Sequence, residues 1–503
     1  MPSAVEQTRR EVSHAIPAKR KSQLGQFFTP ARTARFMAGL FVQTPNSSCH
    51  LLDAGAGIGS LSAAFLERLT AGGLDYQHIT IDAFERDESL HPYLHKTLEE
   101  YRQSLDSVSH VRGGDFVEIA VESMCGSLFA PTLPRYTHAL LNPPYKKIRS
   151  DSAARRALRR AGIETVNLYS AFVAVSLALL AHRGQLVAII PRSFCNGPYY
   201  RPFREFVLER AAIQHLHLFV SRNTAFKDDG VLQENLILRC ERGAPQGEVT
   251  VTSSTDDSFT DLQTDTYPFE RIVLPDDRER FIHIPHSPRQ PTLEESPTAR
   301  SSLSELGISV STGPVVDFRL KPYLRDMPQA GTVPLLYPGH FRGHTIHWPK
   351  PDLKKPNAIV HNAETDKWLY PNGWYCVVRR FSSKEEKRRI VASVVQPHHF
   401  PKAELLGFEN HLNVFHERRQ GLPESLARGL AIFLSTTAVD ETFRRFNGHT
   451  QVNATDLRLL KYPSRAALTA LGEWATNCGE LSQAAVDERV LHGSRVVGRI
   501  SGA

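Results

Sequence analysis

The sequence contains few cysteines and no long apolar stretch. Its six cysteines among 503 residues include no C-x-x-C pair, which excludes a disulfide framework and a structural zinc ribbon. The most apolar stretch, residues 171–181, is well short of the roughly 20 residues that cross a bilayer. The first residues carry charges but lack the apolar core of a secretory signal. We therefore expect a cytoplasmic protein with no membrane span and no metal site.

Repeats and strong charge imbalance are also absent. We find no fixed-period repeat, which argues against solenoids and propellers. Hydrophobic residues make up 41% and charged residues 22%, an ordinary globular composition. The net charge of +7 favours an anionic partner only if it is concentrated on one face. Composition alone therefore does not identify the partner.

The pattern of the chain changes near its middle. From about residue 49 to 240, apolar runs at 50–54, 79–84, 139–141, 186–190, 215–219 and 236–238 alternate with helical patterns. This alternation predicts an α/β domain with a largely parallel sheet. Residues 246–302 are rich in Pro, Ser, Thr and Asp, typical of a connecting segment. Residues 303–503 combine many turns with a helical tail from about 424, which favours an α+β domain.

A glycine-rich loop follows the first predicted strand. Gly55, Gly57 and Gly59 are spaced G-x-G-x-G, unlike the G-x-G-x-x-G of dinucleotide binders, and permit close approach of a ligand to backbone N–H groups. The second strand ends in Glu85, whose carboxylate could accept hydrogen bonds from both hydroxyls of a ribose. Together these features indicate a nucleoside cofactor. The alternative for the loop is a structural strand-to-helix turn.

Two further segments suit the ends of such a cofactor. In Gly114-Asp115-Phe116, a carboxylate could accept from an adenine amino group and an aromatic ring could pack on its face. Upstream, Thr29 is expected to cap a helix over 31–41 with Pro30 at its first position, where backbone donors can hold a carboxylate. A simple capped helix is the alternative. The arrangement suits a ligand with adenosine at one end and an amino-acid carboxylate at the other.

The segment Asn142-Pro143-Pro144-Tyr145 directly follows a short strand. Its prolines predict a rigid loop. An exocyclic amine on a heteroaromatic base is a poor nucleophile because its lone pair is delocalised into the ring. The side-chain oxygen of Asn142 and the carbonyl of Pro143 could accept its two hydrogens, and Tyr145 could stack on the base, so that the nitrogen attacks a sulfonium methyl in line. The alternative is a proline turn that closes a strand.

In this order, the motifs GQFFTP, LDAGAGIG, FERD, GDF and NPPY resemble those of the gamma class of DNA amino-methyltransferases, which use S-adenosylmethionine. The resemblance covers the first half of the chain and implies a Rossmann-like class I methyltransferase sheet in the catalytic domain 1–245. It implies a cofactor site lined by Gln26, Phe28, Thr29, Asp53, Gly55, Gly57, Glu85, Asp115 and Phe116. The catalytic site would be formed by Asn142, Pro143, Pro144 and Tyr145.

The resemblance also places an aromatic residue on the other face of an extruded base, because a duplex base must leave the stack for this chemistry. Phe226, before the run 236–238, is the candidate, and ordinary core packing is the alternative.

Two basic runs could bind DNA phosphates. They contain the candidate DNA-binding residues Lys146, Lys147 and Arg149, directly after the tetrapeptide, and Arg379 and Arg380. Solvated surface is the alternative for both runs.

The later half is expected to read DNA sequence, because the catalytic half grips a single nucleotide. The segments GISVSTG, VVRRFSSKEEKRR and FNGHTQVN, the last of which contains His449, resemble the PstI and BsuBI group of modification enzymes. This narrower resemblance implies a target-recognition domain over 303–503 and adenine methylation in a CTGCAG-type palindrome of double-stranded DNA. It also implies a cognate restriction endonuclease that acts separately. A monomer could modify a palindrome by acting twice, so monomer and dimer both stay open.

Other functions remain open at this point. The same chemistry could act on RNA or on a protein glutamine, since an amide nitrogen has a similarly delocalised lone pair. The chain could also be an inactive DNA-binding defence subunit with a vestigial cofactor fold. Methylation of a cytosine ring carbon is disfavoured because it needs a thiolate beside a proline, which Cys195 lacks.

Overall fold

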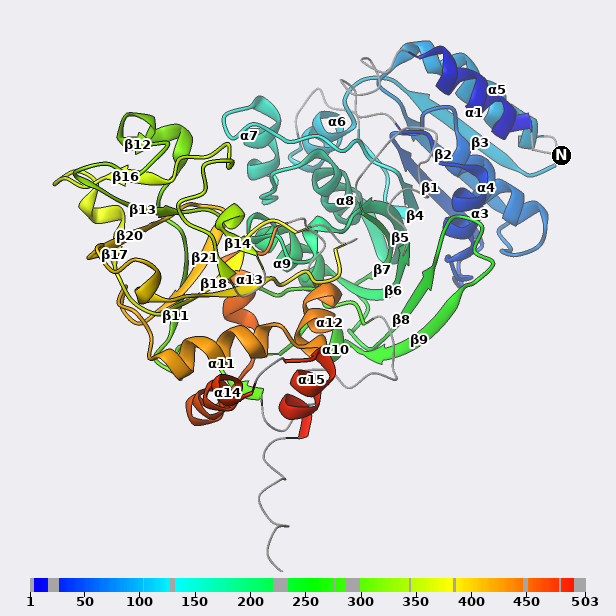
Figure 1. Cartoon of the computed structure of the whole chain (residues 1–503). Helices are drawn as coiled ribbons and strands as arrows, with labels where there is room; N and C mark the ends of the chain where they lie inside the picture. Colours follow the sequence, from blue (N-terminus) through cyan, green and yellow to red (C-terminus); the bar gives the residue numbers. More distant parts are fainter. Residues whose placement is uncertain are drawn as a thin grey trace, which may run out of the picture. The chain divides into compact units, whose positions relative to one another are not determined.

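The computed structural model in Figure 1 describes residues 4–16, 27–102, 104–126, 132–219, 234–275, 277–285, 299–342, 345–382, 386–446, 451–478 and 481–492. The chain divides into two compact units, residues 1–288 and 289–503. Within the described ranges, every helix is too short or too polar to cross a membrane.

The first unit is built on a nine-stranded sheet of order β3-β2-β1-β4-β5-β7-β6-β8-β9. The strands are β1 Ser48–Ala54, β2 His78–Phe84, β3 Ser107–Arg112, β4 Tyr136–Leu141, β5 Leu180–Pro191, β6 Ala211–Phe219, β7 Asn235–Arg242, β8 Glu248–Ser254 and β9 Gln263–Pro268. Strands β3, β2, β1, β4 and β5 are parallel to their neighbours, whereas β7 runs antiparallel to both β5 and β6. The sheet is therefore mixed. Its strand order reverses between β1 and β4, the point where open α/β sheets bind ligands at the carboxyl ends of their strands.

Helices cover both faces of this sheet (Figure 1). The described helices of this unit are α1 Ala4–Ala15, α3 Ala31–Gly39, α4 Ser60–Thr70, α5 His91–Arg102, α6 Phe116–Met124, α7 Ala153–Arg160, α8 Leu168–Leu179, α9 Arg201–Arg210 and α10 Phe269–Ile272. Leu51 packs with α3, α4 and α5, while its neighbour Leu52 packs with α6 and α8. Successive side chains of a strand point to opposite faces, so the continuous apolar run of β1 follows from burial on both sides.

Residues 246–302 differ from the connecting segment that their composition suggested. Strand β8 pairs in parallel with β6, and β9 pairs antiparallel with β8 at the sheet edge. Val249 and Val251 of β8 are buried, but most of β9 is exposed. An edge strand with one solvated face needs few apolar residues, so its polar composition resembles that of a connecting segment.

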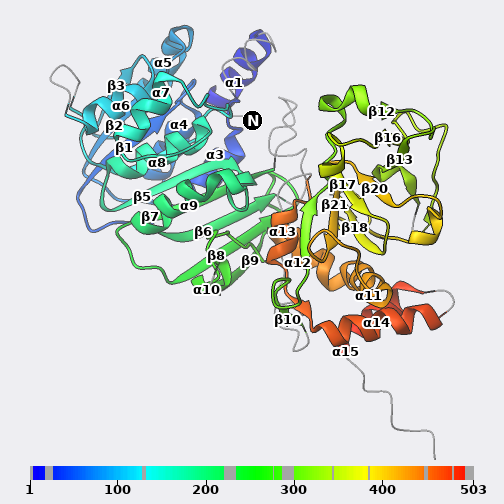
Figure 2. The same cartoon turned by 90° about the vertical axis from the view of Figure 1, so that its left-hand side faces the viewer.

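The second unit is α+β, as expected (Figure 2). A four-stranded sheet has the order β11-β21-β18-β19 and a five-stranded sheet the order β12-β16-β13-β20-β17. Their strands are β11 Ser309–Thr312, β12 Leu324–Arg325, β13 Thr332–Leu336, β16 Ala358–Val360, β17 Leu369–Pro371, β18 Tyr375–Arg379, β19 Ala392–Val395, β20 Leu405–Phe408 and β21 Leu412–His416. Two short pairs are β10 Ala299–Ser301 with β22 Tyr462–Pro463 and β14 Phe341–Arg342 with β15 Thr345–Ile346.

The helical tail of the second unit begins at residue 424, where it was expected. Its helices are α11 Glu424–Leu434, α12 Thr437–Phe446, α13 Ala454–Leu459, α14 Arg465–Asn477 and α15 Gln483–His492. Helices α11 and α14 touch through Gly429 and Gly472, where an added Cβ would lie 1.8 Å from a backbone oxygen of the other helix. Only glycine fits at this crossing.

Candidate active site

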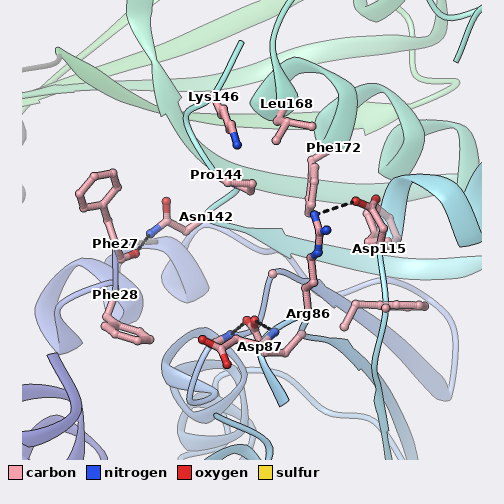
Figure 3. Close-up of a pocket in the computed structure, with 16 residues that line it drawn as sticks. Phe27, Phe28, Arg86, Asp87, Asp115, Asn142, Pro144, Lys146, Leu168 and Phe172 are labelled. Atoms are coloured by element: carbon pink, nitrogen blue, oxygen red, sulfur yellow. Dashed lines mark hydrogen bonds and ion pairs between the residues drawn. The ribbon is translucent and has the colours of Figure 1, made fainter. Parts of the chain in front are cut away.

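A cavity of about 280 Å³ lies at the carboxyl ends of β1, β2 and β4 (Figure 3). It is lined by Phe27, Phe28, Gly55, Gly57, Phe84, Glu85, Arg86, Asp87, Gly114, Asp115, Phe116, Asn142, Pro144, Lys146, Leu168 and Phe172. The structure thus brings eight of the predicted cofactor-binding and catalytic residues to one cavity: Phe28, Gly55, Gly57, Glu85, Asp115, Phe116, Asn142 and Pro144.

The glycine loop closes the cavity beneath the end of β1. The N–H groups of Gly55 and Ala56 donate to the Phe84 carbonyl at 2.8 and 2.9 Å. Gly55, Gly57 and Gly59 have φ values of +81°, +58° and +87°, a region that favours glycine. A Cβ at Gly57 would also lie 3.1 Å from the Phe28 ring. Backbone conformation and the nearby ring therefore both account for the G-x-G-x-G spacing.

The Glu85 carboxylate is held by the backbone on two sides. Its Oε2 accepts from the Gly57 N–H at 2.8 Å and its Oε1 from the Asp87 N–H at 2.7 Å. Glu85 is buried, and burial raises the pKa of its carboxyl, although the two backbone hydrogen bonds oppose the shift. Its lone pairs are therefore presented to the cavity in one fixed orientation.

Asp53 lies behind the loop instead of lining the cavity. The side chain is fully buried, and its Oδ2 accepts from the N–H of Ser62 at 3.2 Å and from its hydroxyl at 2.6 Å. Asp53 thereby ties the end of β1 to the first turn of α4. Burial raises the pKa of this carboxyl to about 7. In the described part of the chain, its Oδ1 has no hydrogen-bond partner.

Asp115 caps α6 and faces the cavity with its second oxygen. Its Oδ1 accepts from the N–H groups of Val117 at 3.0 Å and Glu118 at 3.3 Å. Its Oδ2 lies 3.4 Å from Nη1 of Arg86, an exposed side chain that reaches across the cavity (Figure 3). The next residue, Phe116, contacts the rings of Phe84 and Phe172 at centroid distances of 5.0 and 5.2 Å. This side of the cavity offers one carboxylate oxygen beside aromatic faces.

The Asn142 side-chain amide is oriented by the segment that precedes α3. Its Nδ2 donates to the Phe27 carbonyl at 2.7 Å and to the Thr29 hydroxyl at 3.0 Å. Two acceptors on one side assign the nitrogen to that side and leave Oδ1 on the other. That oxygen accepts from the Tyr145 hydroxyl at 3.4 Å, a long contact. The oxygen is thus directed away from the α3 segment.

Thr29 is not the helix cap that the sequence suggested. The N-cap of α3 is Pro30, with no side-chain hydrogen bond. The Thr29 hydroxyl is instead engaged by Asn142, 113 positions along the chain. Sequence reasoning missed this link and the role of the Phe27 carbonyl, since neither leaves a signal in local spacing.

The N-terminus of α3, which was expected to hold a ligand carboxylate, holds a carboxylate of the chain itself. Glu6 of α1 accepts from the Ala31 N–H at 3.1 Å. It also accepts from Arg9 through two bonds of 2.9 Å. Val5 and Val12 of α1 pack with Phe28. Helix α1 therefore supports the segment that orients Asn142, a contribution absent from the sequence prediction.

Tyr145 and Pro143 complete the tetrapeptide. The Tyr145 hydroxyl lies 3.3 Å from the Ile189 carbonyl, and its ring is 6.1 Å from the ring of Phe27. Burial raises the pKa of this phenol above its ordinary value. Nothing in the described part of the chain donates a hydrogen bond to the Pro143 carbonyl.

The predicted DNA-binding residues fall into two groups. Lys146, Lys147 and Arg149 are exposed immediately after the tetrapeptide, and Lys146 lines the cavity. In the second run, Arg379 forms an ion pair with Glu386 and Arg380 donates to the Asn410 carbonyl at 3.2 Å. Gln26, Phe226 and His449 lie outside the described residues.

Comparisons with known proteins show the family of this chain. Residues 141–226 match the family model described as Eco57I restriction-modification methylase. The type II methyltransferase M.BsuBI of Bacillus subtilis is 52% identical over 94% of this chain and 94% of its own length. The chain belongs to the type II methyltransferases. M.PstI of Providencia stuartii, of the same type, is 40% identical over 96% of this methyltransferase and 95% of its own length.

A solved structure shares the fold. The DrdV–DNA complex, determined by cryo-electron microscopy, matches with a TM-score of 0.51 and 12% identity over 93% of this methyltransferase and 59% of that chain. The class I methyltransferase fold, the assignment to restriction-modification systems and S-adenosylmethionine as cofactor, all expected from the motifs, are confirmed. This methyltransferase acts on DNA.

Proposed function

We propose that this enzyme transfers a methyl group to the exocyclic amino nitrogen of adenine in duplex DNA. The observation that carries the proposal is the fixed orientation of Asn142, whose Nδ2 is taken by Phe27 and Thr29 so that Oδ1 is left to accept from another group. The Pro143 carbonyl, to which no described residue donates, is a second acceptor on the adjacent peptide. Two acceptors suit an amine with two hydrogens.

These acceptors act on the nucleophile. Hydrogen bonds from the amine to Asn142 Oδ1 and to the Pro143 carbonyl draw both hydrogens out of the ring plane, which returns lone-pair density to the nitrogen. The Tyr145 ring packs on the base, and burial raises the pKa of its hydroxyl. Bound S-adenosylmethionine supplies the electrophilic methyl group. Positioning and polarisation supply the rate enhancement, with no covalent enzyme intermediate.

The cavity fits the proposed cofactor. Glu85 has carboxylate oxygens oriented for ribose hydroxyls, Asp115 has one oxygen for an adenine amino group, and Phe116 supplies an aromatic contact. Gly55 and Gly57 leave room for close approach. Gln26, Phe28 and Thr29 are assigned to the amino-acid end by the resemblance to the gamma class. Asp53 acts by holding the glycine loop in place.

The remaining assignments extend from the relatives. We assign residues 303–503 to target recognition, a CTGCAG-type palindrome as the substrate, and Phe226 to the second face of a flipped adenine. Extrusion costs a few kcal/mol, and a Tyr145 and Phe226 sandwich offsets part of this cost. Lys146, Lys147 and Arg149 are assigned to phosphates beside the flipped nucleotide, because they are exposed directly after the tetrapeptide. A separate restriction endonuclease is the expected partner.

The test is to express the chain in cells free of other methylation and to sequence the modified bases. Methyl-adenine at one palindrome, lost in Asn142→Ala, is the expected result. Removing a polarising acceptor of this kind costs roughly 100-fold or more in rate, while the calorimetric affinity for S-adenosylmethionine should stay within a few-fold. Methyl-cytosine, or transfer to RNA or protein alone, would overturn the proposal.

A further inference from the structure

One end of the four-stranded sheet in the second unit gathers exposed aromatic and basic side chains from segments far apart in the sequence. Strand β18 ends at Arg379, β21 begins at Leu412 and β11 ends at Thr312. Because β21 pairs antiparallel with both β18 and β11, these three strand ends lie at the same end of the sheet. We define the aromatic–basic patch as the five residues at this end that combine rings with positive or titratable groups: Phe318, Arg319, Arg380, Phe381 and His411.

Backbone hydrogen bonds hold the three segments side by side. The Arg380 N–H donates to the His411 carbonyl at 2.8 Å, and the Asn410 N–H donates to the Val315 carbonyl at 2.9 Å. On the other side, the Val452 N–H donates to the Arg380 carbonyl at 2.7 Å. The patch therefore rests on a sheet end that is cross-linked by the main chain and not on isolated loops.

Two phenylalanines of the patch are exposed, and each lies beside an arginine. Phe318 is 64% and Phe381 39% exposed. The Arg319 guanidinium is 5.4 Å from the Phe318 ring centroid, and that of Arg380 is 5.9 Å from the Phe381 centroid. The His411 ring contacts Phe381 at 4.9 Å. Exposed large apolar rings that gather in one patch with a polar rim mark interaction surfaces.

Two carboxylates near the patch, among the residues that the structure describes, are already paired. Asp317 accepts from Lys355 at 2.8 Å, and the fully buried Glu409 is bound by His411 at 2.5 Å. Negative charge is thereby neutralised or withdrawn from the surface, while Arg319 remains exposed and Arg380 partly exposed. The partner that suits aromatic rings flanked by arginines is a polyanion with flat faces, that is, the bases and phosphates of DNA.

We propose that the aromatic–basic patch contacts duplex DNA during target recognition, with Phe318 and Phe381 against bases and Arg319 and Arg380 against phosphates. This inference rests on the proposed function, because it assumes that the second unit binds the DNA that the first unit modifies. It assigns DNA contact to Phe318 and Arg319, which the basic runs of the sequence did not indicate. It also distinguishes Arg380 from its neighbour Arg379, which is ion-paired with Glu386.

The test measures transfer of tritiated methyl groups from S-adenosylmethionine to unmethylated bacteriophage DNA by the full-length enzyme. Phe318→Ala and Phe381→Ala should each raise KM for DNA about tenfold, with kcat within twofold, since truncation removes an apolar ring that can wedge between base steps of the duplex. Arg380→Ala should lower the slope of log KM against log salt by about one, as for one lost phosphate contact. Met327→Ala, at a 41% exposed apolar residue outside the three segments, is the matched control and should behave as wild type.

The outcomes separate the two proposals. The tritium count does not depend on which base is modified. If the wild-type enzyme modifies cytosine, the proposed function is contradicted, but the KM values of the patch variants still test the DNA contact. A tenfold rise in KM in either phenylalanine variant, absent from Met327→Ala, supports the patch. Unchanged KM in both overturns it, and Phe318 is exposed enough that its removal leaves folding intact. A wild type that modifies no DNA refutes both proposals together.

Discussion

The hydroxyl of Thr29 should control the rate of methyl transfer by orienting Asn142. It accepts one of the two hydrogen bonds that orient the Asn142 amide, at 3.0 Å, and it is buried. Thr29→Val keeps the shape of the side chain and deletes only this acceptor. Losing the bond and stranding a buried N–H costs about 2 kcal/mol, so we expect the rate of the chemical step to fall roughly 30-fold.

The assay is a single-turnover measurement with enzyme and cofactor in excess over DNA, combined with calorimetric titration of S-adenosylmethionine. Thr33→Val is the matched control, because Thr33 is a buried threonine of α3 whose Oγ1 has no partner among the described residues. The control should retain the wild-type rate and cofactor affinity, whereas Thr29→Val should lose far more in rate than in cofactor affinity. A Thr29→Val enzyme within twofold of wild type would refute the orienting role of this bond.

Three further perturbations follow from the site. Burial raises the pKa of Asp53 to about 7, so the folded state loses stability as pH rises from about 4 to 7. Asp53→Asn lacks this titrating group. The melting temperature of Asp53→Asn minus that of wild type should therefore increase across that pH window. Glu6→Gln removes a carboxylate that binds Arg9 and the N-terminus of α3; we expect a loss of about 2 kcal/mol in thermal unfolding and slower methyl transfer. Arg86→Ala removes an exposed ion pair with Asp115, worth at most about 1 kcal/mol, so cofactor affinity should change less than fivefold, whereas Asp115→Ala should lose more than tenfold.

Each of these has a result that contradicts it. If the difference in melting temperature between Asp53→Asn and wild type does not change with pH, the pKa of Asp53 is not raised in the folded state. Equal effects of Glu6→Gln and of Glu11→Gln, an exposed position on the same helix, would remove any special role of Glu6. A large loss of cofactor affinity in Arg86→Ala, matching that of Asp115→Ala, would show that Arg86 itself binds the cofactor.

The elements that sequence predicted best depend on local pattern. The strands around Leu51, Ile81 and Leu140 are apolar runs buried on both faces, and glycines with positive φ mark the loop after β1. Glu85 was placed correctly at the cavity because a residue that ends a parallel strand must lie at the carboxyl edge of the sheet. These features follow from periodicity and from the requirements of one turn.

What sequence missed depends on contacts between distant segments. The Thr29 hydroxyl is bound by Asn142, and Glu6 occupies a helix end that was expected to be open to a ligand. Neither partner can be inferred from spacing, since each bond exists only once the sheet has assembled. The resemblance to the gamma class assigns Asp53 to the cofactor cavity, whereas its side chain points back to Ser62. Its position in the sequence beside the glycines does not distinguish these two orientations.

The carboxylate of Glu85 has a thermodynamic consequence for how the enzyme exchanges cofactor and product. Hydrogen bonds from the N–H groups of Gly57 and Asp87, at 2.8 and 2.7 Å, already fix the rotamer of its side chain. An acidic side chain that had to be immobilised on each encounter would cost roughly 0.5–1.5 kcal/mol. Here the side chain of Glu85 loses that conformational entropy once, during folding. Each round of cofactor binding and product release therefore begins from a site that is already ordered.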